Sequence, residues 1–160
     1  MACVVDTNVL IAANRENCPQ ATLECQLVCV YELQSIEKNG VLVIDSEWHI
    51  LKEYMRKVSS SGQPGVGDAF LKWVLQNQSN SNRCQQVDIT ETSNGSFKEF
   101  PINSNLNKFD ISDHKFVATA LVHPQKPPIL NALDSDWRHF KSELAAVGIT
   151  VQQLCPETLK

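Results

Sequence analysis

Short apolar segments alternate with helical patterns along most of this chain, and this alternation limits the fold more than any other feature. Segments of strand length that are wholly or mostly apolar occur at residues 2–5, 41–44 and 129–133. A strand that lacks polar positions is covered on both faces, as the strands of parallel sheets are. Helical patterns separate these segments, which is typical of βαβ units. We therefore predict an α/β domain with a mostly parallel central sheet.

Helical patterns fill much of the remaining chain. We expect helices at 8–13, 21–38, from 46 to about 58, 68–77, 112–122 and 137–147. In the second of these, the apolar stripe consists of Leu23, Leu27, Val30, Leu33 and Ile36. In the third, it consists of Trp48, Leu51, Met55 and Val58. Weaker strands are predicted at 86–90 and 149–151, and residues 79–107 predict a peripheral hairpin, turning at Asn94-Gly95, or a surface excursion.

The formal net charge of −4 gives none of the basic character that nucleic-acid-binding proteins usually carry. Carboxylates gathered around divalent cations would offset this deficit locally, so the charge does not exclude a nucleic-acid substrate. No apolar stretch approaches the roughly 20 residues of a membrane helix. A basic, apolar secretory leader is also missing. We therefore expect a cytoplasmic protein that does not bind a membrane.

The chain has six cysteines: Cys3, Cys18, Cys25, Cys29, Cys84 and Cys155. A chain of this length buries a core without covalent cross-links, and export is not indicated, so we expect no disulfide scaffold. Cys25 and Cys29 lie one helical turn apart, but no second close pair of Cys or His accompanies them, as zinc spacing would require. We expect small buried apolar side chains in a reducing compartment.

Acidic residues stand where predicted strands end and helices begin. Asp6 follows the first strand, Asp45 the second and Asp134 a later one, while Asp113 opens the helix at 112–122 and Asp110 precedes it. In a parallel sheet these positions face one edge. Carboxylates that converge there repel one another unless a cation compensates them. Their number favours Mg²⁺ or Mn²⁺, and phosphodiester hydrolysis is the reaction that such a site serves best.

Helix capping is the competing interpretation of any single one of these residues. An Asp at a helix start accepts hydrogen bonds from the first backbone N–H groups and contributes about 1 kcal/mol. Capping is the default interpretation of Asp113 taken alone, since it follows Ser112, and it is the preferred interpretation of Asp68. The joint pattern, rather than any one residue, predicts the metal site.

The acidic segments resemble the PIN domain family of metal-dependent ribonucleases, in the order that the family has them. The segments are VVDTNVLI (4–11), ILKEY (50–54), DHKFVATA (113–120) and LDSDW (133–137). The resemblance extends from residue 4 to about residue 151. It implies a three-layer α/β/α sandwich, a single PIN-like nuclease domain over residues 1–160, and cleavage of RNA with Mg²⁺ or Mn²⁺.

The resemblance also implies roles for individual residues. Its four acidic site residues are Asp6, Glu53, Asp113 and Asp134. Asp6, Asp113 and Asp134 would hold the metal, and Glu53 would position or deprotonate the attacking water, with Glu47 and Asp45 as alternatives to Glu53. Asp136 and Asp110 would be auxiliary carboxylates, Asp136 also as a metal ligand, and Asn8 would orient Asp6.

Basic residues near these acids are candidates for contact with a phosphate backbone. They are Lys52, Arg56 and Lys57, next to Glu53, and Arg138, after Asp136. Solvated charges on a helix face are the competing interpretation.

The preferred function is an endoribonuclease, with the toxin type of the family among its forms. One alternative is a weak or inactive PIN-like module that binds RNA or a protein, because Ala132 stands where the family often has Ser or Thr. A lower-ranked alternative is a HAD-like phosphohydrolase with Asp6 as nucleophile, which would need an Asp in place of Asn8. RNA is the expected partner; an antitoxin or other protein, and a homodimer, stay open.

Overall fold

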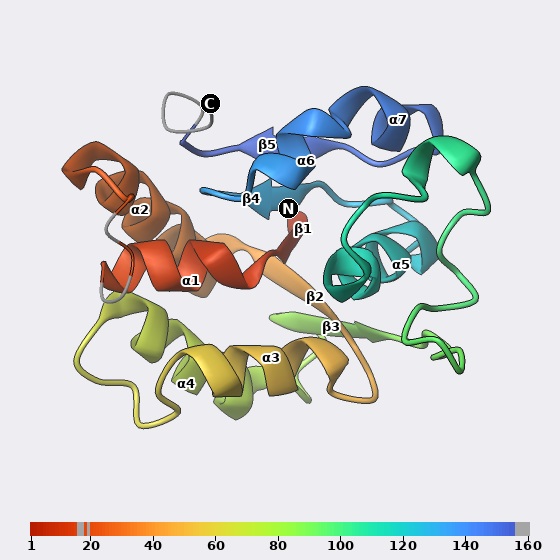
Figure 1. Ribbon diagram of the computed structural model, residues 1–160. Helices are drawn as coiled ribbons and strands as arrows, with labels where there is room; N and C mark the ends of the chain where they lie inside the picture. Colours follow the sequence, from red (N-terminus) through yellow and green to blue (C-terminus); the bar gives the residue numbers. More distant parts are fainter. Residues whose placement is uncertain (16–17, 19, 156–160) are drawn as a thin grey trace.

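The fold is built on one five-stranded sheet in which every pair of neighbouring strands is parallel. The computed structural model describes residues 1–15, 18 and 20–155 (Figure 1). The predicted domain range, 1–160, thus includes residues 16, 17, 19 and 156–160, which lie outside the described part. The strands are β1 (Ala2–Val5), β2 (Val41–Asp45), β3 (Cys84–Val87), β4 (Ile129–Asn131) and β5 (Val151–Gln153).

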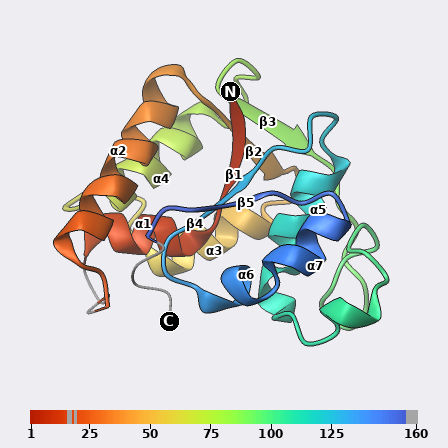
Figure 2. The ribbon, with the colours of Figure 1, turned by 90° about the horizontal axis from the view of Figure 1, so that it is seen from above.

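Helices cover both faces of this sheet, which confirms the predicted α/β sandwich. Figure 2 shows α2 and α4 on one side and α5 and α7 on the other. The α-helices are α1 (Thr7–Asn14), α2 (Leu23–Asn39), α3 (His49–Lys57), α4 (Val66–Asn77), α5 (His114–Val122), α6 (Ser135–His139) and α7 (Lys141–Ala146). Two 3-10 helices, η1 (Ser104–Leu106) and η2 (Ile111–Asp113), precede α5. Among the described residues, no helix combines the length and apolar character needed to cross a bilayer.

The strand order β3-β2-β1-β4-β5 determines where a site can form. The chain first adds strands on one side of β1 and then crosses to add β4 and β5 on the other. The order therefore reverses between β1 and β4, and a crevice forms at such a switch point, outside the carboxyl ends of the strands. Asp6 follows β1 directly, and Asp134 lies three residues beyond β4.

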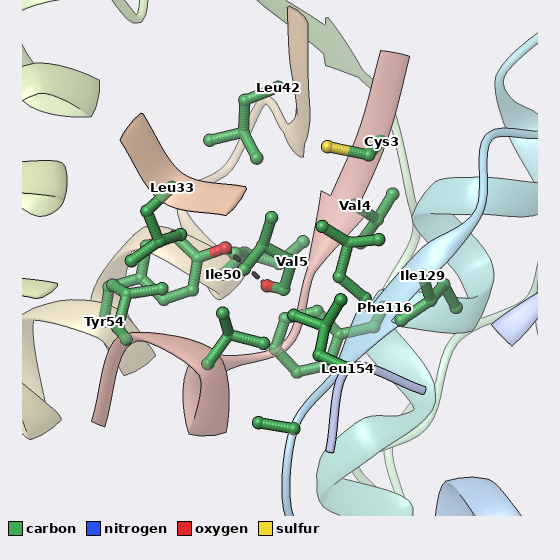
Figure 3. Close-up of a cluster of buried hydrophobic side chains, with 14 of the residues drawn as sticks. Cys3, Val4, Val5, Leu33, Leu42, Ile50, Tyr54, Phe116, Ile129 and Leu154 are labelled. Atoms are coloured by element: carbon green, nitrogen blue, oxygen red, sulfur yellow. Dashed lines mark hydrogen bonds between the residues drawn. The ribbon is translucent and has the colours of Figure 1, made fainter. Parts of the chain in front are cut away.

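The core packs against β1, which is the central strand (Figure 3). Val4 and Val5 are fully buried, and Tyr54 of α3 is buried with them. The Tyr54 hydroxyl donates a hydrogen bond of 2.5 Å to the backbone carbonyl oxygen of Val5. This bond satisfies the only polar atom of the Tyr54 side chain and fixes α3 next to the end of β1.

The buried faces of two helices differ from the prediction. In α2 the buried residues are Cys25, Cys29, Leu33 and Ile36, whereas Leu23 and Leu27 are exposed. In α3 the buried residues are Ile50, Leu51 and Tyr54, whereas Met55 is 44% exposed. In both helices the predicted stripe included apolar residues that lie on the solvent side, because periodicity alone did not count Cys and Tyr as core residues.

Several boundaries differ as well. The strand predicted at 86–90 is β3, at Cys84–Val87; β4 ends at Asn131 rather than 133; and the last strand is Val151–Gln153 rather than 149–151. The helix predicted at 137–147 is two helices that meet at Phe140. Within 79–107, the predicted hairpin is present as an antiparallel bridge between Glu91 and Phe97. Gly95 turns this hairpin with φ +86°, a left-handed conformation that glycine adopts without strain.

The prediction for the cysteines was partly wrong. Cys3, Cys18, Cys29 and Cys84 are buried free thiols, as expected. Cys25 and Cys155, however, form a disulfide across a sequence separation of 130 residues. The separation explains why no spacing rule revealed the pair. The bond joins α2 to the segment that follows β5.

Reduction of this disulfide is expected to lower the free energy of unfolding by about 2–4 kcal/mol, because an open chain has more conformations to lose on folding. The measurement is thermal unfolding followed by circular dichroism, with and without a phosphine reductant. A Cys25→Ser/Cys155→Ser variant serves as the control, since its melting temperature should not respond to the reductant. An unchanged melting temperature in wild-type protein whose thiols titrate as reduced would contradict the prediction.

Candidate metal centre

Asp6 lies at the junction of β1 and α1 and is buried. Its Oδ1 accepts a hydrogen bond of 3.1 Å from the backbone N–H of Asn8, so it caps α1. Its Oδ2 accepts a hydrogen bond from the indole N–H of Trp137, which is fully buried in α6. Both contacts orient the carboxyl group toward the switch-point crevice. Trp137 was not predicted, because nothing in the sequence connects two residues 131 positions apart.

Asp134 is positioned by two asparagine side chains that the structure brings together. The Asn131 amide accepts a hydrogen bond of 3.2 Å from the Asp134 N–H and donates one of 2.9 Å to the Asp134 carbonyl oxygen. Asn8 donates to the Asn131 Oδ1 at 2.8 Å and accepts from the Ala132 N–H at 2.7 Å. The predicted role of Asn8 agrees with its backbone N–H, which donates to Asp6, and its side chain has a further role in fixing the loop that carries Asp134. Asn131 was missed.

Asp113 is the residue whose surroundings distinguish a site from a cap. It stands at the N-terminus of α5, yet its side chain makes no capping hydrogen bond there. Only 6% of the residue is exposed, and its Oδ2 has no hydrogen-bond partner among the described residues. A buried carboxylate oxygen without a partner is costly, on the order of several kcal/mol. Capping, which the sequence left open, does not explain Asp113.

Asp6, Asp113 and Asp134 converge on one point. Each offers a carboxylate oxygen, and these oxygen atoms lie within 4.8 Å of one another. Oxygen ligands around a Mg²⁺ ion lie about 3–4 Å apart, given Mg–O distances of about 2.1 Å. The three residues border a cleft of about 410 Å³, which Thr7, Asn8 and Glu53 also line. The donor set and the unpartnered Asp113 oxygen fit a hard divalent cation.

The electrostatics agree with this geometry. Burial, followed in importance by nearby Asp6 and Asp134, raises the pKa of Asp113 to about 10. Burial also raises the pKa of Asp6 to about 7, against the lowering effect of the Asn8 and Trp137 hydrogen bonds. Without a cation, these carboxyl groups therefore retain protons that isolated aspartates lose near pH 4.

Glu53 lines the same cleft but is engaged in a separate set of contacts. Its Oε1 lies 2.8 Å from the Lys115 Nζ, and its Oε2 accepts a hydrogen bond from the Thr7 hydroxyl. The Glu53 and Lys115 side chains are only 14% and 11% exposed. Sequence reasoning found Glu53 but missed Thr7 and Lys115, although each lies within two residues of a predicted site residue.

The other predicted acids lie outside this group of three. Asp110 and Asp136 form a second group with Asp113, whose carboxylate oxygens also lie within 4.8 Å of one another, so the predicted metal-ligand role of Asp136 would belong to this group and not to the one with Asp6. Asp110 is exposed, and its Oδ1 accepts from the Ser112 N–H. Burial and the charge of Asp134 raise the pKa of Asp136.

The alternatives to Glu53 are structural or exposed. Asp45 accepts hydrogen bonds from the N–H groups of Glu47, His49 and Ile50, so it serves as a cap for the start of α3. Glu47 is exposed. Asp68 accepts from the N–H groups of Ser59 and Gly65, in agreement with its predicted capping role, although it lies inside α4 rather than before it.

Of the predicted basic residues, Lys57 lines the acidic cleft. A neighbouring hollow of about 610 Å³ is lined by both Arg56 and Lys57. Lys52 and Arg138 are exposed, and neither is among the described residues that line these two hollows. Two of the four basic residues thus lie next to the candidate centre.

Comparisons of the chain with protein-family models, with curated proteins and with solved structures found no match.

The raised pKa values predict how pH affects the metal-free protein. The folded state holds protons on Asp6 and Asp113 that the unfolded chain has lost above about pH 4. The free energy of unfolding therefore falls as pH rises, up to about pH 7 for the Asp6 proton and about pH 10 for the Asp113 proton. Each such proton contributes a slope of about 1.4 kcal/mol per pH unit. Urea unfolding in EDTA at pH 5.5, 7 and 8.5 measures it. Asp113→Asn should flatten the slope, while Asp88→Asn, at an exposed carboxylate, should not; equal slopes in all three proteins would refute the assignment.

Proposed function

We propose that this protein is a Mg²⁺- or Mn²⁺-dependent endoribonuclease of the PIN type that hydrolyses phosphodiester bonds of RNA in the cytoplasm. The observation that carries the proposal is the buried, unpartnered Oδ2 of Asp113, at a point where Asp6 and Asp134 also converge. Three carboxyl groups at a topological switch point are costly to keep together, and a divalent cation is the partner that offsets the cost.

The residues of the chain divide into three tasks. Asp6, Asp113 and Asp134 would hold the ion, which supplies activation of water and compensation of the charge that develops at phosphorus. The Asn8 backbone N–H and the Trp137 indole N–H hold the Asp6 carboxyl group, and the Asp136 N–H holds that of Asp134. The side chains of Asn8 and Asn131 fix the backbone that carries Asp134. Because the centre is buried, less water screens its charges, and each charge interaction within it is stronger.

The substrate side of the proposal rests on Arg56 and Lys57. The acidic cleft and the neighbouring hollow share Ile11 and Lys57 as lining residues, so one extended strand could pass along both. Lys57 lies one helical turn after Glu53, which places a positive charge beside the acids. This arrangement suits a single-stranded polynucleotide whose phosphates follow the basic residues while one phosphate enters the acidic cleft.

The HAD-like alternative has less support. It would need an acid at position 8 to protonate a leaving group, but Asn8 is an amide whose side chain is committed to Asn131 and Ala132. A PIN-like module without catalytic activity differs from our proposal in outcome: it would bind the ion or RNA and leave RNA intact.

The proposal predicts cleavage of single-stranded RNA with Mn²⁺ or Mg²⁺ and none with EDTA. Asp113→Asn or Asp6→Asn should reduce the rate at least about 100-fold, because each removes a ligand of the ion. Asp88→Asn, which alters an exposed carboxylate hydrogen-bonded to Ser46, is the matched control and should retain wild-type activity.

Measurement of fluorescent-oligonucleotide cleavage, together with calorimetric titration of Mn²⁺, separates the outcomes. Binding of Mn²⁺ without cleavage would favour the non-catalytic module, and activity that survives Asp6→Asn would refute the metal centre. Growth arrest on expression, relieved by the same substitution, would identify the toxin type and justify a search for an antitoxin or a homodimer.

A further inference from the structure

We propose that Lys115 is a positioning residue that gives the metal centre a built-in positive charge and keeps Glu53 out of the coordination sphere of the ion. The inference rests on the function proposed above, and it concerns which acids contact the ion. It divides the four acids of the cleft into three ligands, Asp6, Asp113 and Asp134, and one acid with a different partner.

Both oxygens of Glu53 already have partners within the protein. Oε1 forms the 2.8 Å ion pair with Lys115, and Oε2 accepts the hydrogen bond of Thr7. Thr7 follows Asp6 directly and is itself buried. The oxygens of Asp6 also accept hydrogen bonds, but only from neutral donors, whereas Glu53 is paired with the charged ammonium group of Lys115. In addition, Glu53 is absent from the group of carboxylates whose oxygens lie within 4.8 Å of one another.

Lys115 is confined to this position as well. The residue is buried, and its Nζ donates to the Ser112 carbonyl oxygen as well as to Glu53. The same Nζ lies 5.2 Å from the centre of the Phe116 ring, on which the side chain rests. A buried ammonium group is costly unless it is paired, and removal of one partner leaves the other charge uncompensated. Separation of Lys115 from Glu53 would therefore cost free energy, and the ion pair is expected to persist.

The charges of the cleft lead to the same conclusion. Four acids line the cleft: Asp6, Glu53, Asp113 and Asp134. The Lys115 ammonium group pairs with Glu53 and neutralises its charge. One divalent ion in the triangle of aspartates then leaves a small residual negative charge. A second divalent ion on the Glu53 side would have to displace or lie beside the Lys115 ammonium group, which opposes it. The arrangement favours an ion between the three aspartates and opposes a second one on the Glu53 side.

Metal affinity in a set of charge-matched variants tests this division of roles. Single substitutions disturb the local charge, so the informative variant is the double one, Glu53→Gln/Lys115→Met, which removes the ion pair and preserves the net charge. If Glu53 is not a ligand, calorimetric titration should give this variant a Kd for Mn²⁺ within about threefold of wild type. Asp113→Asn, which removes a proposed ligand, should weaken binding at least about tenfold.

The single variants should change affinity in opposite directions. Lys115→Met removes a positive charge and releases Glu53, so Mn²⁺ should bind about tenfold more tightly. Glu53→Gln leaves the ammonium group unpaired, so Mn²⁺ should bind more weakly. Lys115→Arg keeps the charge and the ion pair and should resemble wild type. A merely structural role of Lys115 would not produce this pattern of opposite shifts.

Thermal unfolding in EDTA keeps the test informative if a variant is unstable. Each single variant should melt below the double variant, because only the singles bury an unpaired charge. Added Mn²⁺ should raise the melting temperature of Lys115→Met more than that of wild type.

A double variant that loses Mn²⁺ affinity as strongly as Asp113→Asn would overturn the inference and leave the proposed nuclease function standing. Wild-type protein that binds no Mn²⁺ would overturn both. Opposite affinity shifts in a protein that does not cleave RNA would support the inference and refute the nuclease.

Discussion

Mutual repulsion between buried carboxyl groups is the constraint on which the rest of this molecule depends. The parallel pairing of β1 with β4 brings Asp6 and Asp134 to one edge, and α5 adds Asp113. A parallel sheet brings the carboxyl ends of its strands together at little cost in free energy. It does not offset the repulsion between carboxylates at those ends. The Asn8 backbone N–H and the Trp137 indole N–H donate to the Asp6 carboxyl group, and the Asp136 N–H donates to that of Asp134. Desolvation and proximity make Asp6 and Asp113 retain protons.

Aspartates have two roles in this fold, as helix caps and as proposed metal ligands, and an unsatisfied oxygen distinguishes Asp113 from the purely structural caps. Asp45 and Asp68 each accept several backbone N–H groups, so their charge is compensated within the loops that they close. Asp113 occupies a helix start too, but one of its buried oxygens has no partner among the described residues. The unpartnered oxygen of Asp113 indicates a ligand from outside. Asp6 and Asp134 cap α1 and α6, and their assignment as ligands rests instead on the convergence of their carboxylate oxygens with that of Asp113.

Sequence periodicity was sufficient for the three central strands, β2, β1 and β4, because strands without polar positions must be covered on both faces, and strand ends then gave Asp6 and Asp134. It placed the more polar edge strands β3 and β5 only approximately. It was insufficient wherever the decisive contact joins distant segments. Lys115 meets Glu53 across 62 positions and Thr7 meets it across 46, and neither pair follows from local spacing. The faces of α2 and α3 were predicted only in part: Leu33, Ile36 and Leu51 are buried as expected, whereas Leu27 and Met55 are exposed. The burial of Tyr54 depends on the backbone carbonyl of Val5 that lies opposite its hydroxyl.

Because Trp137 donates a hydrogen bond to Asp6, its fluorescence is an intrinsic probe of this carboxyl group. An indole ring responds to charge at its ring nitrogen, and that nitrogen donates to the Asp6 carboxyl group. Trp137 is fully buried, whereas Trp48 and Trp73 are partly exposed and lie elsewhere. Its emission should therefore follow the charge state of Asp6 directly, so that protonation and cation binding at this carboxyl group become visible without a label.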